Sequence, residues 1–81
     1  MEIRYSKKAA KYINKQDAHN KRIIKVAIEN LPNGDVKLIK NHQIITHRLR
    51  VGEYRILYYY IIDDIIYVEK IGVRGDVYKF M

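Results

Sequence analysis

The two kinds of secondary-structure pattern in this sequence are separated along the chain. Helical periodicity is confined to the residues before Pro32, and from Val36 onward the chain has the β-branched and aromatic composition of strands. Such segregation predicts an α+β fold in which two N-terminal helices pack on one face of a mainly antiparallel sheet. A chain of 81 residues can build only one two-layer core, so we expect a single domain over residues 1–81.

Caps, alternation and turns predict the individual elements. Residues 1–5 alternate as a short strand, and helices follow over about residues 7–15 and 18–31, with Ser6 and Asp17 as their N-caps. Strands at about 36–39, 44–51, 54–62 and 65–71 complete a sheet of four to five strands. The second helix carries an apolar stripe that we expect to cover the sheet: Ile23, Ile24, Ala27, Ile28 and Leu31.

Composition restricts the function classes. The 16 Lys and Arg against 9 Asp and Glu give a formal charge of +7, which favours a polyanionic partner, although an ordinary solvated surface explains the charge equally well. The chain has no cysteine, and its three histidines lack the spacing of a zinc site, so we expect no metal and no cofactor. No apolar run approaches the roughly 20 residues that span a bilayer, and the N-terminus lacks a secretion signal. We therefore expect a cytoplasmic protein without a membrane partner.

The strongest local signal is a hairpin whose turn is Gly52-Glu53, since glycine at the first turn position suits the tight type II′ geometry. This turn places Arg50 opposite Arg55 and Arg48 diagonally from it, on the sheet face away from the core, with only Glu53 nearby to offset them. Like charges directly opposite each other destabilise a sheet by roughly 0.2–1 kcal/mol, whereas one charge-assisted hydrogen bond to a phosphate returns roughly 1.5–3 kcal/mol. The spacing predicts an anion-binding site, the alternative being arginines that only keep a sheet edge soluble.

The same register divides the hairpin into two faces. We expect His47, Leu49, Val51, Tyr54, Ile56, Tyr58 and Tyr60 on the core face, and Thr46, Arg48, Arg50, Arg55 and Tyr59 on the other. A second two-residue turn at Asp63-Asp64 would set Gly72 opposite Arg55 and bring Arg74 to the same patch. Tyr78, four residues further on, either reaches this patch, where it could stack on a base, or anchors the tail in the core.

Two segments carry a resemblance to a known family: the hairpin RLRVGEYRILY at residues 48–58 and the tail IGVRGDVYK at residues 71–79. With the preceding strand and helices, they make the sequence resemble the RelE/ParE superfamily of type II toxin–antitoxin toxins over nearly its whole length. The resemblance implies a RelE-like two-layer fold and a cytoplasmic toxin that an acidic, RelB-like antitoxin holds inactive, in a complex that could be a heterotetramer. For the RelE branch it implies metal-independent cleavage of messenger RNA in the ribosomal A site, by attack of the 2′-hydroxyl on the adjacent phosphate.

The resemblance also implies roles for single residues. Arg48, Arg55, Arg74 and Tyr78 match positions of the RelE-type catalytic site, and Arg50, Lys37, Lys40 and Tyr59 are expected to contact RNA. Two departures, Thr46 in place of a lysine and Val73 in place of a histidine, remove groups that could transfer protons. These losses favour the alternative of a ParE-type gyrase inhibitor without nuclease activity. A degenerate member that binds an antitoxin but poisons nothing is the third alternative.

Overall fold

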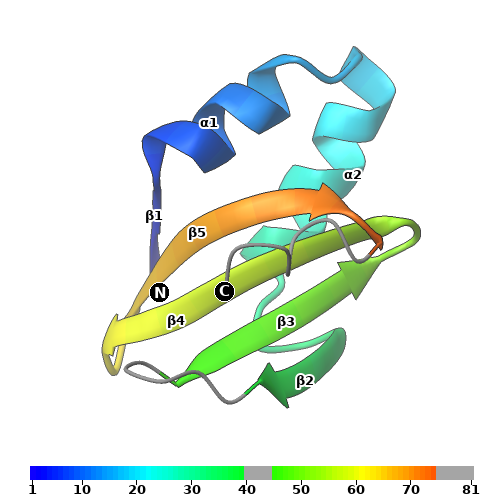
Figure 1. Cartoon of the computed structure of the whole chain (residues 1–81). Coiled ribbons are helices and arrows are strands. Elements are labelled where there is room, and N and C mark those ends of the chain that lie inside the picture. The colour runs from blue at the N-terminus through cyan, green and yellow to red at the C-terminus, as the bar shows by residue number, and fades with distance from the viewer. Residues whose placement is uncertain (40–44, 75–81) are drawn as a thin grey trace.

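Two helices lie on one side of a five-stranded sheet in the computed structural model, which describes residues 1–39 and 45–74 (Figure 1). The elements follow in the order β1 (Glu2–Tyr5), α1 (Lys7–Asn14), α2 (Ala18–Glu29), β2 (Asp35–Ile39), β3 (Thr46–Val51), β4 (Tyr54–Ile62) and β5 (Ile65–Val73). The strand order is β1-β5-β4-β3-β2, with β1 parallel to β5 and the other neighbours antiparallel. The predicted α+β fold is confirmed.

Both helices begin at the predicted capping residues. The Ser6 side chain accepts a hydrogen bond from the backbone N–H of Ala9 at 3.0 Å, and the Asp17 carboxylate accepts one from Asn20 at 2.8 Å. Each bond satisfies one of the free N–H groups in a first helical turn. Among the described residues, neither helix is long and apolar enough to cross a bilayer.

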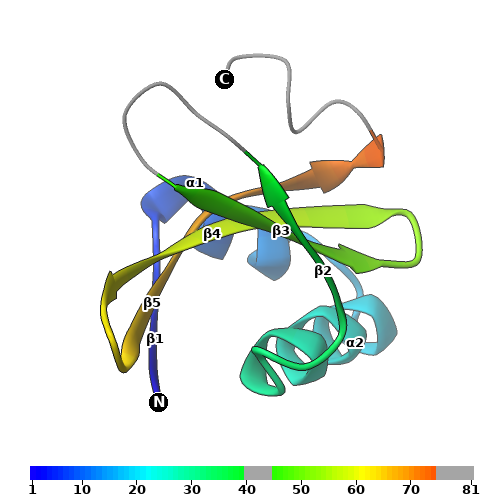
Figure 2. The same cartoon turned by 90° about the horizontal axis from the view of Figure 1, so that it is seen from below.

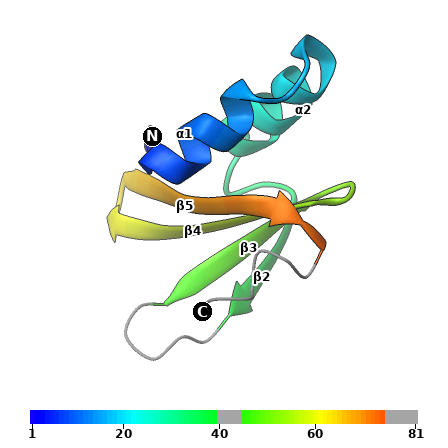
Figure 3. The ribbon, with the colours of Figure 1, turned by 45° about the horizontal axis from the view of Figure 1, so that its top comes forward.

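Only the central residues of the apolar stripe of α2 are buried against the sheet. Ile24, Ile28 and Leu31 are buried and Ala27 is half-buried, whereas Ile23 keeps 39% of its surface exposed. The expectation that Ile23 joins the core is therefore wrong. Consecutive residues lie about 100° apart around a helix, so Ile23 falls on the flank once Ile24 faces the strands. Figure 3 shows both helices on the same side of the sheet, and α2 packs against β3.

The β3–β4 hairpin has the predicted register. Gly52 has a φ of +58°, a conformation that costs glycine nothing, and the strands pair with Arg50 opposite Arg55 and Arg48 opposite Leu57. Because successive side chains alternate between the faces, the arginines lie on the face opposite the helices.

The β4–β5 pairing reaches its predicted register less directly. Gly72 lies opposite Arg55, as the Asp63-Asp64 turn predicts. Between these points the register shifts twice, once at Leu57/Tyr58 and once between Tyr60 and Ile62. The two shifts cancel, so the residues around Arg55 keep the partners that an uninterrupted hairpin would give them.

The core lies between the sheet and the helices. Its strand residues are Leu49, Ile56, Tyr58, Ile66, Val68 and Ile71, with Val51 and Tyr54 partly buried against them. Tyr60, which was expected to pack inside, points to the same side but keeps 37% of its surface exposed. Figure 2 shows the reason: α2 lies toward the β3–β4 end of the sheet and leaves the β4–β5 turn uncovered.

Candidate nucleic-acid interface

The face of the sheet opposite the helices carries a cluster of cations, which we name the basic face. It consists of Lys37, Arg48, Arg50, Arg55 and Lys70, with Arg74 directly after β5. Apart from Arg74, these cations occupy two neighbouring rows across the strands. One row runs Lys37, Arg48, Leu57, Lys70, and the other runs Asp35, Arg50, Arg55, Gly72. The juxtaposition predicted for the arginines is therefore present, and their functional roles stay predictions.

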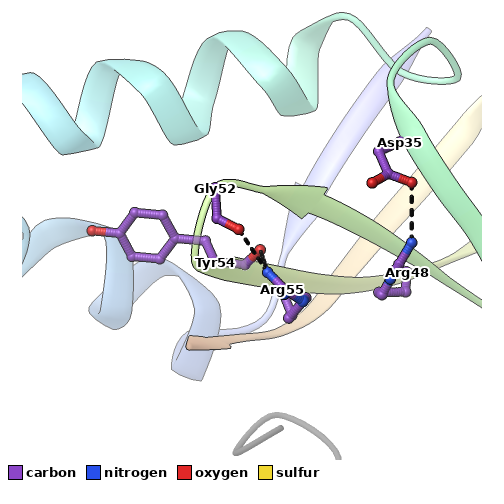
Figure 4. A network of polar contacts seen from close by, with 5 residues as sticks. All are labelled: Asp35, Arg48, Gly52, Tyr54 and Arg55. Atoms are coloured by element: carbon purple, nitrogen blue, oxygen red, sulfur yellow. Dashed lines mark hydrogen bonds and ion pairs between the residues drawn. The ribbon is translucent and has the colours of Figure 1, made fainter. Parts of the chain in front are cut away.

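Arg55 is held against the turn of its own hairpin. Its Nη1 donates hydrogen bonds to the carbonyl oxygens of Gly52 at 2.8 Å and Tyr54 at 3.0 Å (Figure 4). Both acceptors are uncharged backbone groups, so the bonds fix the guanidinium without neutralising it. The Gly52-Glu53 turn thus does more than set the register, because it also positions a cation.

Arg74 is tied to the same turn. Its backbone N–H donates to the carbonyl oxygen of Glu53 at 2.8 Å, and its Nη2 lies 3.5 Å from the Glu53 Oε1. Both side chains of this ion pair are more than 70% exposed, so the pair contributes little to stability. The backbone bond is the firmer constraint, since it holds the end of β5 beside the start of β4. Arg55 and Arg74 are therefore both hydrogen-bonded to carbonyl oxygens at the same turn.

Arg48 has an acidic partner that the sequence analysis missed. Its Nη2 lies 3.2 Å from the Asp35 Oδ1 (Figure 4), and its side chain is only 15% exposed. The expectation that Glu53 alone offsets the arginines is wrong. The predicted strand began at Val36, whereas β2 begins at Asp35 and places that carboxylate directly opposite Arg50.

Arg50 and Lys37 are the most available cations of the face. Both are exposed, and neither makes a hydrogen bond or an ion pair with any residue that the structure describes. Arg50 lies in its row between Asp35 and Arg55. Lys70, which the sequence analysis overlooked, could have been found by extending the β4–β5 register, because that register sets it opposite Leu57.

One other predicted contact residue, Tyr59, is not brought to the arginines. Tyr59 is on the same face, but it follows Arg55 by four residues, roughly 13 Å along the strand, and its ring packs 5.2 Å from that of Tyr67. Burial, with help from the nearby carboxylate of Glu69 and from Tyr67, raises the pKa of Tyr59. Lys40 and Tyr78 lie outside the described residues.

An aromatic group on the helix side is separate from the basic face. The His47 ring stacks on Tyr58 with 5.2 Å between centroids, and Tyr60 meets both rings edge-on. Burial, reinforced by Tyr60, raises the pKa of Tyr58 to about 12, so this phenol is neutral at pH 7. Its hydroxyl and the His47 Nδ1 are buried without a hydrogen-bond partner in the described chain, which fits a packing role.

The basic face is suited to bind and orient a phosphate. Its guanidinium groups offer forked donors whose geometry suits the oxygens of a phosphate. Across residues 1–39 and 45–74, no three His, Asp or Glu side chains gather in a way that could hold a metal ion.

Fold and face together define a small α+β domain with an arginine-rich sheet surface opposite its helices. A solved structure shares this fold: a chain of the archaeal RelE–RelB complex from Pyrococcus horikoshii OT3 aligns with a TM-score of 0.70 over 93% of this chain and 96% of that chain, at 21% sequence identity. No protein-family model matches the sequence, and no curated protein matches it. The RelE-like fold is therefore confirmed, and what the chain does has to be inferred from its own side chains.

Proposed function

We propose that the chain is the toxin of a type II toxin–antitoxin system and that it cleaves messenger RNA on the ribosome in the cytoplasm. One observation carries the proposal. The four arginines come from β3, β4 and the end of β5, yet they lie together at one face of the sheet, with Arg55 and Arg74 bonded to the same turn, in a fold shared with a chain of a RelE–RelB complex. A site for RNA phosphate explains why like charges are placed together in spite of their repulsion.

In the proposed reaction the 2′-hydroxyl oxygen of a ribonucleotide attacks the adjacent phosphorus atom. A new O–P bond forms, the P–O5′ bond breaks, the 2′-hydroxyl loses its proton and the departing 5′ oxygen gains one. Arg55 and Arg74 hold the phosphate and stabilise the charge that builds on it. Arg48 contacts the phosphate or polarises the 2′-hydroxyl, and Tyr78 donates to the leaving oxygen or stacks on the base.

Positioning and electrostatics supply most of the rate in this proposal. Arginine stays protonated below a pH of about 12 and tyrosine below about 10, so neither is an efficient proton shuttle at neutral pH. Preorganised donors around a developing negative charge can still lower the barrier substantially, and orientation of the substrate lowers it further. A toxin built in this way depends on the ribosome to hold its RNA, which agrees with cleavage in the A site.

The proposed partner is an acidic antitoxin that covers the basic face and the helices. The similar chain was solved in a complex named for RelE and RelB. For the present chain, the net charge of +7 and the exposed cations Arg50 and Lys37 support a partner of opposite charge. Binding to such a partner should weaken as salt is added, because exposed charges are screened.

Two observations favour a ParE-type gyrase inhibitor as the second candidate. Thr46, which stands where the RelE-type site has a lysine, is 1% exposed, and Arg48 is largely buried and paired with Asp35. Both features reduce the groups that the described part of the face can offer to a 2′-hydroxyl. A binding toxin needs the arginine surface but none of the acid–base chemistry.

Mapping the 5′ ends of transcripts after a short induction of the parent chain tests the proposal. A nuclease produces new ends within codons, at positions that follow the ribosomal reading frame. Growth arrest with intact transcripts and inhibited gyrase would instead identify the ParE-type activity. Normal growth during induction would leave only antitoxin binding. An uninduced culture sampled at the same times is the control.

A further inference from the structure

Asp35 places a carboxylate among the arginines of the basic face. Its Oδ1 lies 3.2 Å from the Arg48 Nη2 (Figure 4), and its backbone is the direct cross-strand partner of Arg50. The Asp35 side chain is 58% exposed, so this negative charge is in contact with solvent on the same surface that presents Arg50. An anion approaching these two arginines meets a carboxylate that is already beside them.

Arg48 has little capacity to bind a second anion while this pair persists. Its side chain is only 15% exposed, and its Nε is buried without a hydrogen-bond partner in the described chain. The accessible donors are few, and Nη2 is engaged by Asp35. A phosphate that binds the Arg48 Nη2 competes with this carboxylate for the same group, and a phosphate elsewhere on the guanidinium is still repelled by the adjacent negative charge.

We propose that Asp35 is an internal counter-ion that competes with phosphate for Arg48 and lowers the affinity of the basic face for RNA. That the displacing anion belongs to RNA rests on the function proposed above. The competition makes the isolated protein a weak binder of free RNA. A phosphate held in place at high effective concentration, as on a ribosome, displaces the carboxylate more readily than one in dilute solution.

Binding of a short fluorescein-labelled single-stranded RNA to the full chain, followed by anisotropy at 0.1 M salt, tests this competition. Asp35→Asn removes the charge and keeps the size, and we expect the Kd to fall by roughly three- to tenfold, the effect of one unit charge near a surface-bound phosphate. The dependence of log Kd on log salt should steepen by roughly 0.7, the value for one added phosphate contact on a single strand. Asp35→Glu keeps the charge and should bind within about twofold of the parent.

Asp63→Asn is the matched control, since it makes the same change of charge in the β4–β5 turn. Asp63 lies six residues along β4 from Leu57, the neighbour of Arg48, which is roughly 20 Å and beyond the Debye length at 0.1 M salt. We expect this variant to bind within about twofold of the parent and with the same salt slope.

The outcomes separate this proposal from the proposed nuclease. Equal effects of the two asparagine variants, weaker binding by Asp35→Asn, or no measurable RNA binding by either the parent or Asp35→Asn would each overturn the competition. Tighter binding with a steeper salt slope, but without new transcript ends in the induction experiment, would support the competition and reject the nuclease. New transcript ends with no effect of Asp35→Asn on RNA binding would support the nuclease and reject the competition.

Discussion

Replacing Arg55 with alanine should reduce cleavage more than it reduces stability. The substitution removes two hydrogen bonds to backbone carbonyl oxygens, which contribute about 0.5–1.5 kcal/mol each at most and less at a partly exposed site. It also relieves the repulsion from Arg50, worth roughly 0.2–1 kcal/mol. The net loss of unfolding free energy is therefore roughly 0–3 kcal/mol, which is too small to unfold a domain with a typical stability of roughly 5 kcal/mol or more. Loss of one preorganised donor should slow cleavage by roughly 10²–10³-fold, or about 2.7–4 kcal/mol in the barrier.

Two measurements on the same variant test this reasoning. Single-turnover cleavage of message on programmed ribosomes gives the change in barrier, and urea denaturation gives the change in stability. Arg22→Ala is the matched control, since it removes an exposed arginine from α2, on the opposite side of the sheet. It should cleave at the parental rate. A folded Arg55→Ala variant that cleaves within threefold of the parent would refute the role given to Arg55.

Three further changes have expected outcomes. Arg50→Gln should alter the free energy of unfolding in urea by less than about 0.5 kcal/mol, because the repulsion between Arg50 and Arg55 and its attraction to Asp35 offset each other. The same variant should bind RNA several-fold more weakly, and binding equal to that of the parent would contradict the role given to Arg50. Tyr58→Phe should leave stability at pH 7 unchanged or raise it by up to about 1 kcal/mol, since the hydroxyl has no partner in the described chain. In the parent, the unfolded phenol ionises near pH 10 and the folded one at about 12, so stability is lost as the pH rises between these values, and the variant should lose less. Gly34→Ala should cost about 1–3 kcal/mol in thermal unfolding, because φ is +118° and the new Cβ would lie 3.0 Å from the Leu49 Cδ1; an unchanged midpoint would contradict it.

Local signals predicted most of the fold because each is read over a few residues. Ser6 and Asp17 cap helices through their own side chains, and Gly52 sets a two-residue turn through its backbone. The prediction that Gly72 lies opposite Arg55 was also correct, although it assumed an uninterrupted β4–β5 pairing and the actual pairing is interrupted. Two register shifts in the β4–β5 pair cancel, and nothing in the alternation of this apolar stretch marks where they fall.

The side-chain partners of the site were harder to predict than its positions. Pairing rules place Arg48, Arg50 and Arg55 on one face, but they do not say where a long side chain goes. Arg55 folds back onto the turn, and Arg48 finds Asp35 because β2 begins one residue before the predicted strand. An edge-strand boundary is uncertain by a residue or two in any sequence-based assignment, and here one residue decides whether a carboxylate belongs to the site.

The available positive charge is unevenly distributed over the basic face. Arg48 is largely buried and paired with a carboxylate, whereas Arg55 is held by uncharged carbonyl oxygens and Arg50 has no partner in the described chain. The carboxylate that faces Arg74 is highly exposed and separated from it by 3.5 Å, so it neutralises that guanidinium only weakly. The attraction for an anion is consequently strongest beside the Gly52-Glu53 turn and weakest toward β2. A phosphate should therefore bind first at the turn and engage Arg48 last, after displacing Asp35.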